Sequence, residues 1–102
     1  MEFNEMNEEL HDRIWAGALK DVSTTEFLVL LCLGVFTSTK TGRCNLAQST
    51  IADKTRMSRR GVIYAINGLE VKGYIVRQQE YSADGGKAPC NYIVNTDRLP
   101  QL

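Results

Sequence analysis

The fold of this chain is decided by residues 46–75, which read LAQSTIADKTRMSRRGVIYAINGLEVKGYI. In the first part of this stretch, Ile51 and Ala52 give residues 48–56 an apolar side, and this spacing predicts a short helix. Residues 56–58 then interrupt the pattern. We expect a tight turn there, with Arg56 in the left-handed backbone conformation that glycine more often occupies.

A second, longer helix is predicted over residues 58–72. Ser58 is a good N-cap, because its side chain can accept a hydrogen bond from a backbone amide of the first turn. Gly73 is placed to end the helix. The apolar residues that recur on one face between them are Val62, Ile66 and Leu69. Two helices joined by a tight turn are the helix-turn-helix arrangement.

An amphipathic helix is predicted near the start of the chain, over residues 7–20. Its apolar positions, spaced for one side of a helix, are Leu10, Ile14, Ala18, Trp15 and Leu19. We expect these side chains, Trp15 included, to pack on the next helix of the same chain. Contact between two copies of the chain is the alternative.

The next predicted helix, residues 24–37, is apolar nearly all round, so we expect it to lie at the centre of the domain. Ser23 and Glu26 have the spacing of a capping box, in which each side chain bonds the other residue's backbone amide. This pair predicts where the helix begins.

A β-hairpin is predicted after the helices. Residues 74–81 and 90–94 are rich in strand-forming side chains and flank a turn-rich segment, and residues 44–46 could add a short strand. Helix, helix, short strand, helix, helix and hairpin is the winged-helix order. The expected class is α+β, mainly α. Residues 1–22 would form an extra N-terminal helix packed on a winged-helix domain of residues 23–98.

The same stretch also resembles a known group of sequences. The Ile51-Ala52 pair, the Ser58-Arg59-Arg60 start and the Leu69-Glu70-x-x-Gly73-x-Ile75 end look like those of winged helix-turn-helix domains. In particular they resemble the N-terminal DNA-binding domains of phage and plasmid replication proteins, over roughly residues 23–94. The resemblance implies double-stranded DNA as the partner and replication initiation as the process.

The outward face of the longer helix predicts which residues contact DNA. At about 100° per residue, Arg60, Tyr64 and Asn67 lie opposite the apolar face. In the major groove, Arg can pair bidentately with guanine and Asn with adenine. Contacts to the DNA backbone are expected from a further set: Lys54, Arg56, Ser58, Arg59, Arg77 and Lys87.

The distribution of charge favours this interpretation, although the formal net charge is zero. Residues 1–30 hold seven acidic residues against two basic ones, whereas residues 40–98 hold ten basic residues against five acidic ones. Because salt screens a charge beyond about 8–10 Å, the second half can carry a positive face while the first stays acidic. Four of the seven residues from 54 to 60 are basic, which favours DNA contact over an ordinary solvated surface.

The sequence gives little support to other classes of function. One histidine, three cysteines without a CxxC pair, and no Gly-rich phosphate loop predict no enzyme, no metal site and no cofactor. We expect Cys32, Cys44 and Cys90 to be reduced thiols, although a pairing of Cys44 with Cys90 under oxidation stays open. No apolar run approaches the ~20 residues of a membrane span, and no signal-peptide pattern is present, so the expected location is the cytoplasm with no membrane partner.

Three interpretations of the function stay open. The first is a replication-initiation domain, with other regions of a longer protein recruiting the replication machinery. The second is a small stand-alone transcriptional regulator. The third is a winged helix used for protein–protein contacts through its acidic N-terminal helix. A homodimer is possible, and the Leu99-Pro100-Gln101-Leu102 end favours a domain excised from a longer chain.

Overall fold

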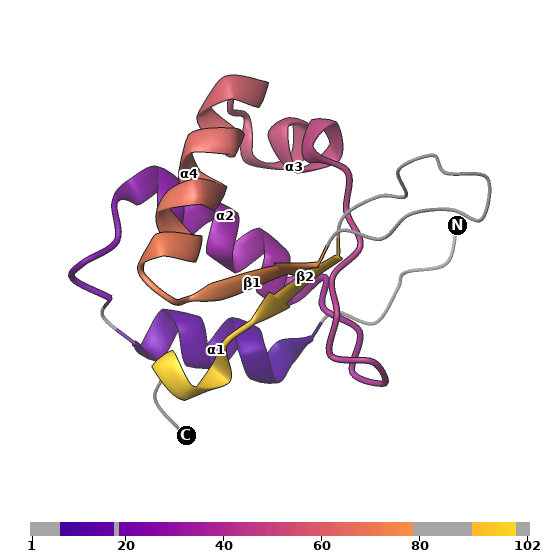
Figure 1. The fold of residues 1–102 in the computed structure, drawn as a ribbon. Coiled ribbons are helices and arrows are strands. Elements are labelled where there is room, and N and C mark those ends of the chain that lie inside the picture. The colour runs from indigo at the N-terminus through magenta and orange to yellow at the C-terminus, as the bar shows by residue number, and fades with distance from the viewer. Residues whose placement is uncertain (1–6, 18, 79–90, 100–102) are drawn as a thin grey trace.

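The computed structural model describes residues 7–17, 19–78 and 91–99. Its elements, in chain order, are the helices α1 (Glu8–Ala16), α2 (Thr24–Val35), α3 (Gln48–Thr55) and α4 (Arg59–Val71), the strands β1 (Ile75–Gln78) and β2 (Asn91–Val94), and the short 3-10 helix η1 (Thr96–Arg98). Figure 1 shows these mainly helical elements with the hairpin following the helices. This arrangement confirms the predicted class, a winged helix-turn-helix.

Helix α2 forms the centre of the structure. It contacts α1, α3, α4 and β2, and its Val29, Leu30 and Leu33 side chains are fully buried. The predicted capping box is present, since Ser23 Oγ accepts from the Glu26 backbone N–H at 3.2 Å and Glu26 Oε1 accepts from the Ser23 N–H at 2.8 Å. An apolar helix that begins at a polar cap is therefore covered on several sides, as its sequence predicts.

The turn between α3 and α4 is built as the sequence predicts. Arg56 takes the left-handed conformation, with φ of 61°, and Ser58 Oγ accepts from the Gly61 N–H at 3.0 Å. Gly73 follows α4 with φ of 83°, which lets the chain reverse into β1. Ala47 gives α3 no side-chain cap. Apolar packing on α2 and α4 holds α3 instead, since Ile51 and Ala52 are buried.

The hairpin is antiparallel, with Ile75 opposite Val94 and Gln78 opposite Asn91. The predicted short strand at residues 44–46 is reduced to one bridge, in which Cys44 and Tyr92 exchange backbone hydrogen bonds of 2.8 Å. This bridge fixes the segment before α3 to the returning strand. The outer ends of the predicted strands and the turn between them lie outside the described residues.

Helix α1 packs on α2 through Leu10 and Ile14, which belong to the same core cluster as α2. The helix ends at Ala16 rather than near Lys20, because the Gly17 N–H bonds the Ile14 carbonyl and closes the last turn. Predicted Ala18 lies outside the described residues. The division of the chain at residues 22 and 23 stays a prediction.

The prediction that Trp15 packs in the core is wrong. Its ring does contact the next helix, edge-on to the Phe27 ring with centroids 5.2 Å apart, but the side chain is 57% exposed and so lies at the edge of the α1–α2 contact. Leu10 and Ile14 point at α2, so Trp15, one residue beyond Ile14, is turned about 100° away from that contact. Among the described elements, α2 is the main partner of α1.

Helices α2 and α4 approach closely at Gly68. Glu26 is buried there, and its Oε1 accepts a 2.6 Å hydrogen bond from Lys72 Nζ at the end of α4. Burial acts to raise the pKa of Glu26, but the hydrogen bonds from Lys72 and from the Ser23 N–H lower this pKa below its ordinary value. One carboxylate thus caps α2 and binds the end of α4.

Gly68→Ala is expected to destabilise the fold by about 1–2 kcal/mol, because overpacking outweighs the gain in helix propensity. The added methyl group would overlap Glu26 Oε2 and lie 3.0 Å from Cδ of that carboxyl group. Urea unfolding measures the change. In a Glu26→Ala background the overlap is gone, so the same substitution should stabilise by up to about 1 kcal/mol. Equal effects in both backgrounds would contradict this explanation of Gly68.

Candidate nucleic-acid interface

The face of α4 that points away from α2 carries the predicted base-reading residues. Arg60, Tyr64 and Asn67 are exposed, and Tyr64 is 68% exposed, whereas Val62 and Ile66 on the other face are fully buried. The helix therefore presents arginine, tyrosine and asparagine together to an outside partner. Contact of these three residues with DNA stays a prediction.

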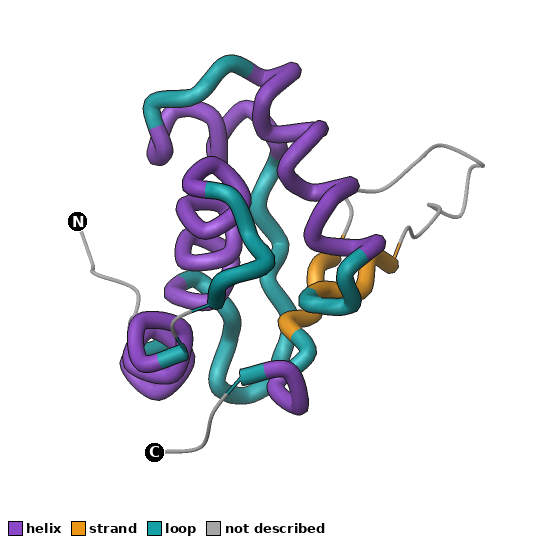
Figure 2. The backbone as a smooth tube through the Cα atoms, turned by 90° about the vertical axis from the view of Figure 1, so that its left-hand side faces the viewer, coloured by secondary structure: helices purple, strands orange, loops and turns teal. Residues whose placement is uncertain are grey.

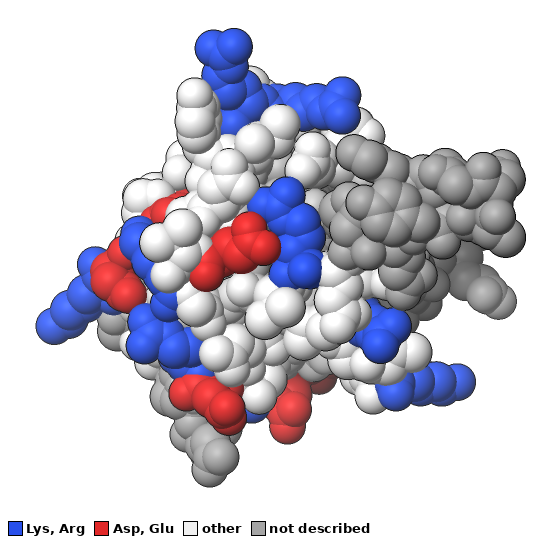
Figure 3. Space-filling view, viewed as in Figure 1, with Lys and Arg blue, Asp and Glu red and all other residues white. Residues whose placement is uncertain are grey.

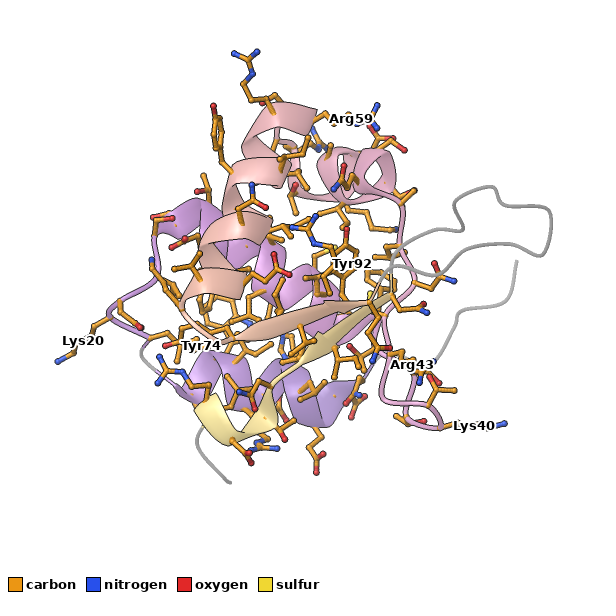
Figure 4. The ribbon with its side chains drawn as sticks, viewed as in Figure 1. Lys20, Lys40, Arg43, Arg59, Tyr74 and Tyr92 are labelled. Carbon is orange, nitrogen blue, oxygen red and sulfur yellow. The ribbon has the colours of Figure 1, made fainter. Side chains whose placement is uncertain are left out.

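A cluster of basic side chains surrounds the turn between α3 and α4, here called the basic turn: Lys54, Arg56, Arg59 and Arg60. All four are exposed. Within residues 7–17, 19–78 and 91–99, none of them forms an ion pair. Figure 3 shows Lys and Arg side chains gathered at the top of the molecule, and Figure 4 places Arg59 there. The charge is therefore available to an anionic partner.

The local structure of the basic turn adds to its positive potential. The first turn of α4 holds no acidic residue, and its amides point outward at the positive end of the helix dipole. The Ser58 side chain accepts from the Gly61 amide, and the Ser58 carbonyl accepts from the Val62 amide. Lys54 is held nearby, with its ammonium 4.7 Å from the centroid of the Phe36 ring. Basic side chains at this end of a helix repel its dipole, and an anion would relieve that repulsion.

Arg77, on β1, contacts α4. Its Nη2 donates to Asn67 Oδ1 at 2.8 Å and to Glu70 Oε1 at 3.0 Å. The predicted contact of Arg77 with the DNA backbone would have to use guanidinium N–H groups other than those that bond Asn67 and Glu70. Lys87, the other predicted wing residue, lies outside the described residues.

Two basic residues that the sequence analysis did not select lie in the loop between α2 and α3. Lys40 and Arg43 are exposed and line an open hollow of about 1040 Å³ beside Asn91. Figure 4 places both far from Arg59, toward the other end of the molecule. Two basic residues close together in a polar, glycine-containing loop could have indicated an anion-binding surface. They were not chosen as DNA contacts because they lie outside the helix-turn-helix pattern.

The described part of the chain offers no group of three or more His, Cys, Asp and Glu side chains that could hold a metal ion. Cys32 and Cys44 are free and buried, and burial raises the pKa of Cys44 to about 12, so this thiol stays protonated. Cys90 lies outside the described residues, and so does its pairing with Cys44. None of the described helices is long and apolar enough to cross a bilayer.

The first and last described elements, α1 and η1, lie away from the basic turn. In Figure 1, α1 and η1 lie at the bottom and the α3–α4 turn at the top, and the turned view of Figure 2 separates α1 from α4 in the same way. Arg13 ties the two terminal elements together, since its Nη2 donates to the Thr96 carbonyl at 2.9 Å. The acidic α1 is thus held at a distance from the basic turn.

Comparison with known proteins agrees with this geometry. A family model described as a helix-turn-helix domain matches residues 20–75, which is more than half of the chain. No match was found among curated proteins or among solved structures. The family match supports the helix-turn-helix part of the resemblance seen in the sequence. It gives no support to the resemblance to phage and plasmid replication proteins. On this match and this fold, the chain belongs to the helix-turn-helix domain family, a family of DNA-binding domains.

Proposed function

We propose that this protein binds double-stranded DNA in a sequence-specific manner, with α4 in the major groove. The observation that carries the proposal is the basic turn: four exposed basic side chains that form no ion pair with any other described residue, at the N-terminal end of the second helix of a helix-turn-helix. In helix-turn-helix proteins the N-terminal residues of this helix contact base edges.

The proposed contacts fall into two groups. Arg60, Tyr64 and Asn67 would face base edges, because they share the exposed face of α4. The residues proposed to hold the DNA backbone are Lys54, Arg56, Ser58, Arg59, Arg77 and Lys87. Such contacts fix the position of the domain on the duplex and supply most of the sequence-independent affinity.

We further propose replication initiation as the process. Its support is the resemblance of residues 46–75 to phage and plasmid replication proteins, since the family match does not specify a process. A stand-alone transcriptional regulator is the alternative. Footprinting on the DNA of the organism that encodes the chain separates them: repeated sites within a replication origin favour the first, and sites overlapping promoters favour the second.

A second candidate function is protein–protein contact through α1. The exposed Trp15 favours it, because a large aromatic side chain in water is a frequent anchor of protein interfaces. Exposed Glu8, Glu9 and Asp12 on the same helix would suit a basic partner or orient a homodimer. This surface is separate from the basic turn, so both functions can coexist.

Arg60→Ala is expected to weaken binding to the preferred duplex by about 1–3 kcal/mol if Arg60 reads a base. Its exposure implies that the fold is unaffected, which thermal unfolding checks. Fluorescence anisotropy with the preferred duplex, found by selection from a random pool, measures the affinity. Lys20→Ala is the matched control, since it removes one exposed positive charge far from the basic turn. Unchanged affinity in the Arg60 variant would show that this residue is a solvated side chain.

A further inference from the structure

An apolar side chain, Ile63, lies among the polar residues on the exposed side of α4. It comes three residues after Arg60 and four before Asn67, a spacing that makes it a neighbour of both on the helix surface. Its side chain is 37% exposed, whereas those of Val62 and Ile66 are fully buried. The buried core cluster of the described residues does not include it. Ile63 therefore adds apolar surface to the middle of the proposed DNA interface.

The stability of α4 does not explain an isoleucine at this position. A β-branched side chain loses rotamer freedom in a helix, so alanine, leucine or lysine would favour the helix more. More than a third of the side chain is also left in water. Single exposed apolar residues are common on protein surfaces, so exposure by itself carries no argument. What distinguishes Ile63 is its place between two residues proposed to read bases.

The surroundings of Ile63 determine what it would meet in a complex with DNA. It lies one helical turn beyond Arg60 of the basic turn, so a duplex held there with α4 in the major groove would cover it. Isoleucine has no hydrogen-bonding group, and it can therefore bond neither a phosphate nor the polar edge of a base. The apolar group that bases present in the major groove is the C5-methyl group of thymine.

We propose that Ile63 is a specificity-determining residue that contacts the 5-methyl group of a thymine, so that the preferred site contains an A·T base pair there. The inference rests on the proposed function and extends it to a residue outside the polar set. At 1.5 Å per residue, Ile63 lies about 4.5 Å beyond Arg60 and about 6 Å before Asn67 along α4. These distances correspond to one or two base steps of about 3.4 Å. The thymine should lie between the base pairs that Arg60 and Asn67 meet.

The test compares thymine with deoxyuridine, which lacks the 5-methyl group and keeps every hydrogen-bonding group of the base. The full chain is titrated by fluorescence anisotropy against its preferred duplex, found by selection from a random pool. Each thymine of this duplex is then replaced in turn by deoxyuridine. We expect one replacement to weaken wild-type binding about three- to fivefold, which corresponds to the burial of one methyl group. Its position should fall between those where Arg60→Ala and Asn67→Ala erase the base preference.

Two variants of Ile63 connect this loss to the side chain. Ile63→Ala should bind the thymine and deoxyuridine duplexes equally, because the shortened side chain no longer reaches the methyl group. Ile63→Val keeps the β-branched shape and should show an intermediate ratio of the two affinities. This ratio, measured within one variant, does not depend on the fraction of protein that is folded. A loss of stability in either variant therefore cannot imitate the expected result.

Val71→Ala is the matched control. It truncates another exposed apolar side chain of α4, which is 88% exposed and lies about two turns further along the helix, near its end. This variant should keep the full difference between thymine and deoxyuridine. A ratio reduced equally by Ile63→Ala and Val71→Ala would show that apolar surface on α4 acts without a specific contact, and this would contradict the inference.

Two further results would overturn the inference while leaving DNA binding intact. One is a preferred duplex in which no thymine between the two marked base pairs is sensitive to deoxyuridine. The other is an Ile63→Ala variant that keeps the wild-type ratio, and loss of the ratio in Tyr64→Ala would then assign the methyl contact to Tyr64. If the wild-type chain bound no duplex at all, the proposed function itself would fail.

Discussion

Raising the salt concentration from 50 to 200 mM is expected to weaken binding of this protein to random-sequence duplex by roughly a hundredfold. Each phosphate that a basic side chain neutralises releases counterions, and log K falls with log[salt] by about 0.9 per contact. The four side chains of the basic turn are exposed and form no ion pairs among the described residues. If each contacts one phosphate, the slope of log K against log[salt] should be about −3.6. Anisotropy titrations at five salt concentrations measure the slope.

Arg56 provides the sharpest variant for this measurement. It holds the left-handed conformation with φ of 61°, where glycine would be less strained by about 1 kcal/mol. Arg56→Gly should therefore raise the stability of the fold and at the same time make the salt slope shallower by about 0.9 if Arg56 contacts a phosphate. Opposite changes in stability and binding cannot come from partial unfolding. They would also explain why an arginine occupies a glycine position, since strain is often stored at functional sites.

Lys40→Gln is the matched control for the basic turn, because Lys40 is exposed in the loop far from Arg59. The salt slope of this variant should equal that of the wild-type protein. A flat salt response of the wild-type chain would remove the electrostatic basis of the proposed function and favour protein–protein contact through α1. A slope that Lys40→Gln and Arg56→Gly reduce equally would place the contact on a different surface.

Features that depend on neighbouring residues in the sequence could be predicted well. The Ser23–Glu26 capping box, the Ser58 cap and the left-handed Arg56 each follow from a few adjacent positions, and the structure contains all three. Local hydrogen bonding sets these features, so the same residues that specify them also form them. The helix-turn-helix and the direction of the exposed face of α4 follow from this local information.

Features that depend on distant residues could not be predicted. The periodicity of α1 identified its apolar side but not how many elements cover it, and this is why Trp15 was placed in the core. The hydrogen bond from Arg77 to Asn67 joins residues on different elements, and each was selected separately as a DNA contact. The reason for Gly68 also became visible only with Glu26 beside it, because the two are 42 positions apart in sequence.

The largest effect on stability is expected from Ile14→Ala. Ile14 is fully buried between α1 and α2, and truncating a buried isoleucine to alanine costs about 2–5 kcal/mol through lost burial and the cavity left behind. For a chain of this size, the melting temperature should fall by roughly 10–20 °C. Trp15→Ala is the control on the same helix. It removes a larger side chain, but one that is mostly exposed, so the loss of stability should be about 1 kcal/mol.

The comparison of these two variants shows whether α1 mainly stabilises its own chain or joins two chains. If α1 packs within its own chain, the melting temperature of the wild-type protein should not depend on protein concentration, and sedimentation should show a monomer. If α1 instead joins two chains through its exposed side, Trp15→Ala should have the larger effect, and it should lower the dimer affinity. A larger loss of stability in the Trp15 variant than in the Ile14 variant would contradict intrachain packing.

Gly34 allows the α1–α2 contact to be tested directly. A methyl group added at Gly34 would lie 2.5 Å from Ile14 Cδ1, so Gly34→Ala alone should destabilise the fold by about 1–3 kcal/mol. In the Ile14→Ala background the obstructing atom is absent, and the next contact of the new methyl group would be an ordinary one at 3.6 Å, to Leu10 Cβ. There Gly34→Ala should stabilise by up to about 1 kcal/mol through helix propensity. Chemical unfolding of the four proteins of this double-mutant cycle measures the coupling, and additive effects would show that α1 does not dock on α2 through Ile14.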